Sequence, residues 1–385
     1  MNKWDQMKEE LESLKKNHTY RKMTGFSSAQ EKIVRVEGKP QHLFSSNSYL
    51  DLCNEPGLKE YTKAVIDEFG VGSGGSRLTT GTGSIHLLLE KTIADFKKRE
   101  AALVFNTGYM ANCGIISALA KKGDIIYSDE LNHASVIDGC RLSKAELVIY
   151  KHNDMVDLEK KIKEHAGVPG MIVSDGVFSM DGDIVNLPGL VELAKRYNLL
   201  SMIDEAHATG VIGETGRGTE EFYHMEGSVD VLMGTLSKAI GSEGGFVCGS
   251  KLLIDYLTNK SRSFIFSTAL SPASIAASIA GIRKIDREPE RVRKLQENVS
   301  YCCQRLREAG FDVDSKTAII PIMVYEEDRA MALMKCLKEH GYYVSAIRYP
   351  TVAKHSARLR LALMSSHTKE EIDGLVELLK RFEWM

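Results

Sequence analysis

The amino-acid sequence predicts an α/β fold. A central, mostly parallel seven-stranded sheet carries helices on both faces, and a smaller α+β domain follows at the C-terminal end. Between about residues 101 and 250, seven short apolar runs alternate with helical patterns. After about residue 285 the alternation gives way to longer helices and isolated strands. Strands that alternate with helices typically form a parallel sheet covered on both faces.

The predicted elements follow the apolar pattern. Strands are expected at 102–105, 124–127, 147–150, 171–173, 200–203, 231–233 and 245–248, and in the tail at 318–324 and 358–363. Helices are expected at 1–16, 85–98, 110–119, 155–164, 188–197, 288–309, 329–340 and 369–382. At 385 residues the chain exceeds one small core. We therefore expect an N-terminal helix and arm (1–45), a large domain (46–285) and a small C-terminal α+β domain (286–385). Ligands of such sheets bind beyond the carboxyl ends of the strands.

The composition excludes several classes of function. The chain is 43% apolar and 26% charged with a net charge of -2, so no nucleic-acid partner is expected. The seven cysteines are odd in number and lack CxxC spacing, which favours reduced thiols in a cytoplasmic protein over disulfides or a metal site. No run of about 18 apolar residues and no signal-peptide pattern occur, so no membrane partner is expected.

Two blocks place polar residues directly after predicted strands. Asp204 ends one apolar run, and His207 follows three residues later in the block 204–207. A carboxylate there can pair with a ring nitrogen that must stay protonated, because a pyridine ring is an electron sink only while that proton is held. A helix cap or a salt bridge is the alternative for Asp204, and a satisfied polar group is the alternative for His207.

Lys238 ends the second block, which begins at Gly234 and is followed by the glycine-rich stretch 239–245. Most lysines are solvated surface groups. A desolvated lysine in a cleft has a lower pKa and can act as a nucleophile and a base. Thr235 and Ser237 carry small hydroxyl groups suited to phosphate oxygens.

Two further segments suit a phosphorylated ring. Residues 106–109 join a strand to a helical run, and a helix N-terminus preceded by glycine is a phosphate site because free N–H groups and the helix dipole converge there. His133 follows another strand end and could stack on a ring; a loop histidine that caps a helix is its alternative.

Nucleotide-binding alternatives fail on context. The glycine-rich run 70–77 does not follow a strand of a βαβ unit, so it is not a dinucleotide-binding fingerprint. Residues 204–207 resemble the acidic box of helicase-type NTPases. The chain has no phosphate loop ending in Gly-Lys-Ser or Gly-Lys-Thr, which disfavours that alternative.

Taken together, these residues resemble the α-oxoamine synthases, a family of fold-type I pyridoxal-phosphate (PLP) enzymes. The resemblance extends from about residue 45 to 367. Its strongest blocks are 72–75, 131–139, 175–182, 204–213 and 234–238. Several ordered blocks of this length make the resemblance specific.

The resemblance implies PLP as the cofactor and a catalytic role for four residues. Lys238 would be the Schiff-base lysine and the proton-transfer base. Asp204 would pair with the pyridinium nitrogen, His207 with the ring hydroxyl oxygen, and His133 would stack on the ring.

The remaining implied site residues bind phosphate, ring or substrate. Backbone groups of Gly108 and Tyr109, with Thr235, would hold the phosphate, and Ser179 would lie on the oxygen side of the ring. Thr268 resembles a residue that reaches the phosphate of the neighbouring subunit, which implies a homodimer with shared active sites. The implied substrate residues are Arg358 for the amino-acid carboxylate, Asn47 near it and Arg21 toward the acyl group. A planar guanidinium suits bidentate carboxylate binding.

Within the family, residues 74–81 resemble most the branch that makes 8-amino-7-oxononanoate. That resemblance implies a PLP-dependent acyltransferase of biotin biosynthesis, which condenses L-alanine with a pimeloyl thioester of coenzyme A or acyl carrier protein and releases CO2. Transfer of acetyl from acetyl-CoA to glycine, giving 2-amino-3-oxobutyrate, is the alternative within the family. A non-catalytic binding protein on the same fold is the alternative from another class. Two departures from the family pattern, at 47–52 and at 353–355 where a glycine is missing, bear on substrate choice.

Overall fold

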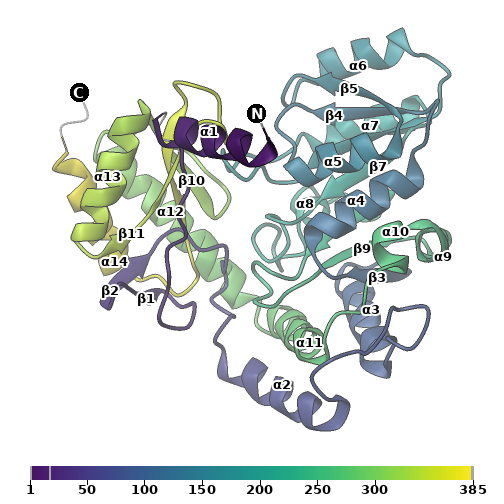
Figure 1. Cartoon of the computed structure of the whole chain (residues 1–385), viewed down its shortest axis with the longest axis horizontal. Coiled ribbons are helices and arrows are strands. Elements are labelled where there is room, and N and C mark those ends of the chain that lie inside the picture. The colour runs from purple at the N-terminus through teal and green to yellow at the C-terminus, as the bar shows by residue number, and fades with distance from the viewer. Residues whose placement is uncertain (1, 17–18, 383–385) are drawn as a thin grey trace.

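The computed structural model describes residues 2–16 and 19–382 (Figure 1). Met1, the first residue of the predicted N-terminal helix, lies outside them. The strands are β1 (Ile33–Val36), β2 (Lys39–Leu43), β3 (Ala101–Phe105), β4 (Ile125–Asp129), β5 (Glu146–Tyr150), β6 (Gly170–Asp175), β7 (Leu200–Asp204), β8 (Val231–Thr235), β9 (Gly245–Gly249), β10 (Ile319–Tyr325), β11 (Tyr342–Tyr343), β12 (Ser345–Ile347) and β13 (Ala357–Ala362).

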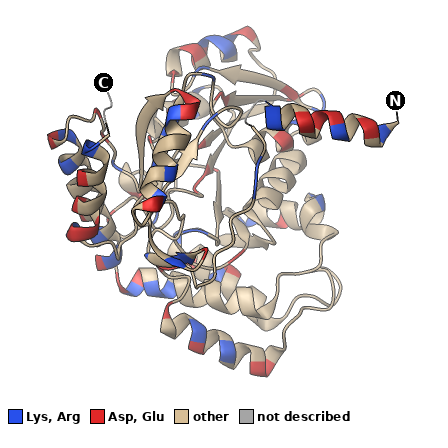
Figure 2. Cartoon of the chain, turned by 60° about the vertical axis from the view of Figure 1, so that its left-hand side comes forward, with Lys and Arg blue, Asp and Glu red and all other residues tan. Residues whose placement is uncertain are grey.

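The helices alternate with the central strands and dominate the C-terminal part. They are α1 (Lys3–Lys16), α2 (Pro56–Phe69), α3 (Ser84–Phe96), α4 (Gly108–Leu119), α5 (Ala134–Ser143), α6 (Met155–Glu164), α7 (Leu187–Arg196), α8 (Thr219–Phe222), α9 (Lys251–Lys260), α10 (Arg262–Ile265), α11 (Pro272–Arg287), α12 (Glu290–Glu308), α13 (Glu327–Glu339) and α14 (Lys369–Lys380). Basic and acidic residues are interspersed along the helices (Figure 2). Within the described part of the chain, no helix is long and apolar enough to cross a membrane.

The central sheet has seven strands in the order β3-β9-β8-β7-β6-β4-β5. Strand β9 is antiparallel to both neighbours, β3 and β8, while β8, β7, β6, β4 and β5 pair in parallel. Strand β3 consequently runs in the same direction as β8. The carboxyl ends of β3, β4, β6, β7 and β8 therefore meet at one edge of the sheet, where a ligand site is expected.

Alternate residues of each central strand enter two different apolar cores. In β4, Ile125 and Tyr127 join one core while Ile126 joins the other. The first core includes apolar residues of α3, α7 and α11, and the second those of α4, α5 and α9. Because successive side chains of a strand point to opposite faces, this alternation shows that both faces of the sheet are covered by helices.

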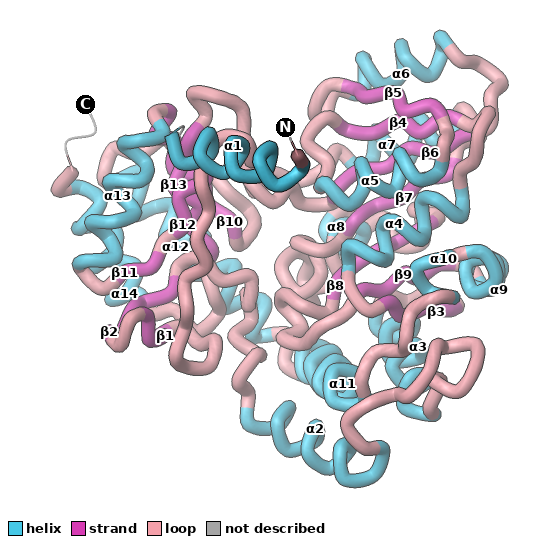
Figure 3. Tube along the Cα trace, viewed as in Figure 1, coloured by secondary structure: helices cyan, strands magenta, loops and turns pink. Residues whose placement is uncertain are grey.

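A second, smaller unit stands beside the central sheet (Figure 3). Its antiparallel sheet has the order β10-β13-β12, and helices α12, α13 and α14 belong to the same unit. The N-terminal arm contributes to it, because β2 pairs in parallel with β11 and forms the sheet β1-β2-β11. The backbone N–H of Phe44 donates to the carbonyl of Tyr343 at 2.9 Å and continues this contact.

The predicted α/β architecture is confirmed. All seven expected central strands occur in one sheet, and the strands and helices expected after residue 285 occur as β10, β13, α12, α13 and α14. Strands β1, β2, β11 and β12 and helices α2, α5, α9 and α11 are among the elements not predicted from the sequence. The domain boundaries at residues 45 and 285 stay a prediction.

Candidate active site

A cavity of about 250 Å³ lies at the edge of the sheet where the parallel strands end. Its lining comes from the ends of β6, β7 and β8, from the loops after β4, β6, β7 and β8, and from the N-terminus of α4. Seven of the predicted residues line it: Gly108, Tyr109, His133, Asp204, His207, Thr235 and Lys238. Residues more than one hundred positions apart in the sequence therefore meet here, as the strand directions require.

Lys238 lies in the loop after β8, and its side chain is partly buried in the cavity wall. Its Nζ is 2.8 Å from Nε2 of His207. Burial lowers the pKa of Lys238 to about 8, although the nearby carboxylates of Asp204 and Asp175 act in the opposite direction. At pH 7 about a tenth of this amine is consequently neutral and nucleophilic, far more than for an ordinary lysine.

Asp204 ends β7 and presents its carboxylate to the cavity. Its Oδ2 accepts a 2.7 Å hydrogen bond from Nδ2 of Asn112 on α4, and its Oδ1 accepts a 2.9 Å hydrogen bond from the backbone N–H of Ala206. Both carboxylate oxygens thus have a donor, which fixes the orientation of the group. Asn112 was not predicted from the sequence.

His207 is buried between Lys238 and Tyr49. Its Nδ1 is 2.6 Å from the hydroxyl of Tyr49, so both ring nitrogens have a hydrogen-bond partner. Burial, reinforced by the positive charges of Lys238 and Arg360, holds the pKa of His207 well below its usual value. The imidazole is therefore neutral at physiological pH.

The N-terminus of α4 forms one end of the cavity. Thr107 caps the helix by accepting from the N–H of Met110 at 3.1 Å. Among the described residues, no hydrogen bond uses the N–H groups of Gly108 and Tyr109. Thr235 lies beside Gly108, because a Cβ added at that glycine would be 3.4 Å from the Thr235 hydroxyl. Free N–H groups at a helix N-terminus, joined by a hydroxyl, form a site for a phosphate.

His133 is the N-cap of α5, and its ring lies edge-on to the ring of Tyr109, with the centroids 6.3 Å apart. Its Nδ1 lies 2.7 Å from the hydroxyl of Ser135, and partial burial lowers the pKa of the imidazole. Its backbone N–H points to the buried carboxylate of Asp175 at 3.4 Å. Burial, together with the charge of Asp204, raises the pKa of Asp175. Ser135 and Asp175 line the cavity and were not predicted as site residues.

Two arginines of β13 lie near this edge, with different partners. Arg358, the predicted carboxylate-binding residue, pairs with Asp181 and donates to the carbonyl of Ser356 at 3.1 Å. Arg360 donates to the carbonyl of Ser179 at 2.6 Å and to Oδ1 of Asn47 at 3.3 Å. Arg360 also affects the pKa of Lys238, and it was not predicted.

Besides Arg358, four further predicted residues are not part of the cavity lining. Ser179 and Asn47 lie near it through their contacts with Arg360. Thr268 is exposed; its carbonyl accepts from Nδ2 of Asn106 at 2.9 Å, beside the glycine-rich run. Arg21 is exposed and donates to the hydroxyl of Thr351 at 3.3 Å. The roles expected of these residues stay predictions.

The donor set fits a phosphorylated pyridine aldehyde. A carboxylate, a lysine of lowered pKa, a neutral histidine and a helix N-terminus surround one cavity. In the roles predicted from the sequence, Asp204, Lys238 and His207 each contact a different atom of the cofactor. Oδ1 of Asn112 is buried without a hydrogen-bond partner among the described residues, as expected where a ligand completes a site. No group of three or more metal-ligating side chains occurs in the described ranges.

Comparison with known proteins identifies the family. The aminotransferase class I and II family matches residues 39–379. The chain belongs to this family. A relative from Lysinibacillus sphaericus, called 8-amino-7-oxononanoate synthase, is 48% identical over 379 residues, which are 98% of this chain and 97% of the relative.

Solved structures confirm the fold class. A serine palmitoyltransferase variant from S. paucimobilis, with a bound PLP–myriocin aldimine, superposes with a TM-score of 0.92 at 30% identity and covers 98% of this chain and 96% of its own. An 8-amino-7-oxononanoate synthase from Francisella tularensis superposes with a TM-score of 0.77 at 29% identity and covers 88% of this chain and 96% of its own. The predicted fold-type I PLP-dependent transferase fold and the resemblance to α-oxoamine synthases are thereby confirmed.

Proposed function

We propose that the chain is a PLP-dependent acyltransferase that condenses L-alanine with a pimeloyl thioester and forms 8-amino-7-oxononanoate, CO2 and the free thiol in biotin biosynthesis. The names of the full-length relatives support the product, 8-amino-7-oxononanoate. The cavity supports the cofactor, because Lys238, His207 and Asp204 line it together. The contact between Lys238 and His207 is the observation that carries the proposal.

PLP, when bound, supplies an electron sink for the carbanion formed at the α-carbon of the amino acid. The lysine amine is suited to cofactor attachment because burial keeps its pKa at about 8. Nζ of Lys238 would take the α-proton of the amino acid as a general base. The Asp204 carboxylate would hold the proton on the ring nitrogen, and its two hydrogen bonds keep it oriented for this task.

Other residues bind and orient. The N–H groups of Gly108 and Tyr109 and the hydroxyl of Thr235 would bind the phosphate, and the imidazole of His133 would stack on the ring. His207 would face the ring hydroxyl with its Nε2. The presence of these five residues in the cavity wall supports these roles.

The amino-acid carboxylate needs a guanidinium close to the lysine. We assign it to Arg360, because this residue contacts Asn47 and its charge reaches Lys238. Arg358 remains the alternative, although its guanidinium pairs with Asp181. A planar guanidinium binds a carboxylate through two parallel hydrogen bonds.

We further propose a homodimer with shared active sites. Thr268 supports it: the residue is exposed, lies next to the glycine-rich run through its bridge with Ser76, and is absent from the cavity of its own chain. A hydroxyl placed in this way is available to the phosphate of a second copy. The seven cysteines are unpaired, which fits the reducing cytoplasm, where we place the protein.

The test of the function compares two substrate pairs. Purified enzyme with PLP is incubated with L-alanine and pimeloyl-CoA, or with glycine and acetyl-CoA, and the release of coenzyme A is followed. We expect turnover with the first pair and formation of 8-amino-7-oxononanoate. Turnover with glycine and acetyl-CoA alone would make the chain a glycine acetyltransferase. Release with neither pair, from folded enzyme that binds PLP, would reject both activities.

A further inference from the structure

A chain of four hydrogen bonds leads away from the lysine into the protein. Nζ of Lys238 is 2.8 Å from Nε2 of His207, and Nδ1 of His207 is 2.6 Å from the hydroxyl of Tyr49. The Tyr49 hydroxyl is 3.1 Å from Oδ1 of Asn47. The same Oδ1 accepts from Nη2 of Arg360 at 3.3 Å. This series of hydrogen bonds therefore links the guanidinium of Arg360, which can only donate, to the amine of Lys238 in the cavity.

Arg360 sets the direction of every bond in this chain. A guanidinium has donors and no acceptor, so Asn47 must present its oxygen rather than its amide nitrogen to Arg360. The single hydroxyl hydrogen of Tyr49 then goes to that oxygen. Arg360 also donates to the Tyr49 hydroxyl at 3.4 Å. Only a lone pair of the hydroxyl is left for Nδ1 of His207, so this nitrogen must carry the hydrogen.

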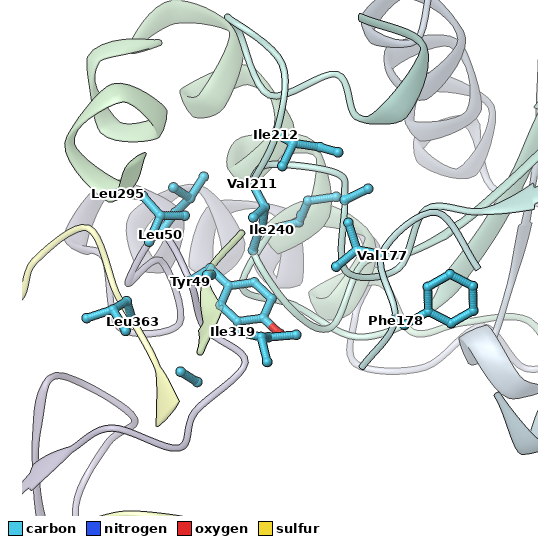
Figure 4. Close-up of a cluster of buried hydrophobic side chains, with 14 of the residues drawn as sticks. Tyr49, Leu50, Val177, Phe178, Val211, Ile212, Ile240, Leu295, Ile319 and Leu363 are labelled. Carbon is cyan, nitrogen blue, oxygen red and sulfur yellow. The ribbon is translucent and has the colours of Figure 1, made fainter. Parts of the chain in front are cut away.

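The burial of Tyr49 and His207 agrees with the protonation states that these hydrogen bonds require. Tyr49 is fully buried, and burial raises the pKa of its phenol, so its hydrogen is retained. His207 is neutral because burial and the charge of Lys238 lower its pKa. Figure 4 shows the ring of Tyr49 among apolar side chains of both units of the chain, including Ile240 and Ile319. Packing of this kind holds the phenol in one position.

We propose that Tyr49 is a positioning residue that fixes His207 as the tautomer with hydrogen on Nδ1 and a free lone pair on Nε2. That lone pair is directed at Lys238 and the cavity. The opposite tautomer would present an N–H there. The consequence for catalysis rests on the proposed function: His207 would then accept the hydrogen of a ring hydroxyl instead of donating one to its oxygen.

The tautomer is measured directly in the cofactor-free full chain. Histidine ring nitrogens labelled with 15N are observed by long-range 1H–15N correlation at pH 7.5, and the signals of His207 are assigned with His207→Gln. We expect a protonated Nδ1 and an unprotonated Nε2. A protonated Nε2, or a doubly protonated ring, would overturn the proposal. Because no cofactor is present, the outcome is independent of whether PLP binds, which absorbance after PLP addition reports separately.

Three variants test whether Tyr49 determines the tautomer of His207. Tyr49→Phe removes the acceptor for Nδ1, so we expect the single tautomer to be replaced by a mixture. Asn47→Leu frees the Tyr49 hydrogen for Nδ1, so we expect a shift toward the Nε2–H tautomer. Tyr223→Phe is the matched control: it removes a phenol that donates to Val185 at 2.9 Å outside the cavity lining, and it should leave His207 unchanged. An unaltered His207 tautomer in both Tyr49→Phe and Asn47→Leu would contradict the proposal.

Discussion

The side-chain amide of Asn112, on α4, donates a 2.7 Å hydrogen bond to Oδ2 of Asp204, at the end of β7. The second oxygen of Asp204 accepts from the backbone N–H of Ala206 at 2.9 Å. The carboxylate is thus held by two elements that the sheet brings together, and it faces the cavity from a fixed direction. This relationship makes the role of Asp204 testable with a small substitution.

Asp204→Asn should lower turnover strongly without unfolding the protein. The variant loses the negative charge that would hold the proton on the ring nitrogen of the cofactor. Its side-chain amide also lies opposite the Nδ2 donor of Asn112. We expect a loss of about 100-fold or more in kcat, the size seen when one preorganised electrostatic group is removed from an active site. Asp230→Asn is the control, because Asp230 bonds to Ser201 outside the cavity. Equal losses in the two variants would argue against a specific role for Asp204.

Arg360→Gln should raise KM for the amino acid more than Arg358→Gln does. Loss of a charge-assisted pair with a carboxylate costs about 3 kcal/mol, or about 100-fold in KM. Arg358 pairs with Asp181 in the loop after β6, so its substitution should affect stability more than amino-acid binding. Steady-state kinetics against L-alanine separates the two arginines. The larger KM increase in Arg358→Gln would restore the role first predicted from the sequence.

The buried ion pair between Lys97 and Glu205 should be a major contributor to stability. Its atoms are 3.2 Å apart, both side chains are about 1% exposed, and Glu205 directly follows Asp204. Lys97→Met leaves the carboxylate buried without its partner, which costs about 3–5 kcal/mol. Urea denaturation measures the change in the free energy of unfolding. Lys91→Met, in an exposed pair with Asp95, is the control and should show little change.

His152 should stabilise the protein in a pH-dependent manner. Its imidazole lies between Asp129 at 3.0 Å and Asp183 at 2.7 Å. Burial opposes its charge, but these two carboxylates outweigh burial and raise the pKa of His152 to about 10. A raised pKa means that the folded protein binds the proton more tightly, so the stabilisation is complete below about pH 6.5 and is lost as the pH rises through about 10.

The corresponding measurement compares wild type with His152→Gln from pH 6 to pH 11. At pH 6 we expect the variant to be less stable by about 1–2 kcal/mol, a value reduced for the partial exposure of the imidazole. The difference should shrink at high pH. A difference that does not vary with pH would contradict the charged bridge.

The central sheet was predictable because its strands are continuous apolar runs separated by amphipathic helices. The phosphate-site residues and Lys238 could be predicted from the same pattern, because the carboxyl ends of parallel strands share one edge of the sheet. Strands β1 and β2 were not predicted: β2 (Lys39–Leu43) is short and polar in part, and its pairing with β11 depends on residues about 300 positions away. Local sequence carries no information on such a partner.

The active site was likewise only partly predictable from the sequence. Arg358 and Arg360 are two positions apart on β13, so both occupy the same face of the strand and periodicity cannot separate them. Their different partners, Asp181 and Asn47, are decided by how the small unit docks on the sheet. Asn112 lies in a mostly apolar helical run, and its contact with Asp204 depends on the sheet order.

The most direct test of the account is covalent trapping at Lys238. The purified chain is incubated with PLP, reduced with borohydride, digested and analysed by mass spectrometry. We expect a pyridoxyl group on Lys238 and none on Lys238→Ala. We also expect attachment to the cofactor-free protein to accelerate as the pH rises toward about 8, where the buried amine loses its proton. A folded wild-type chain without the adduct, or with the adduct on another lysine, would contradict the account.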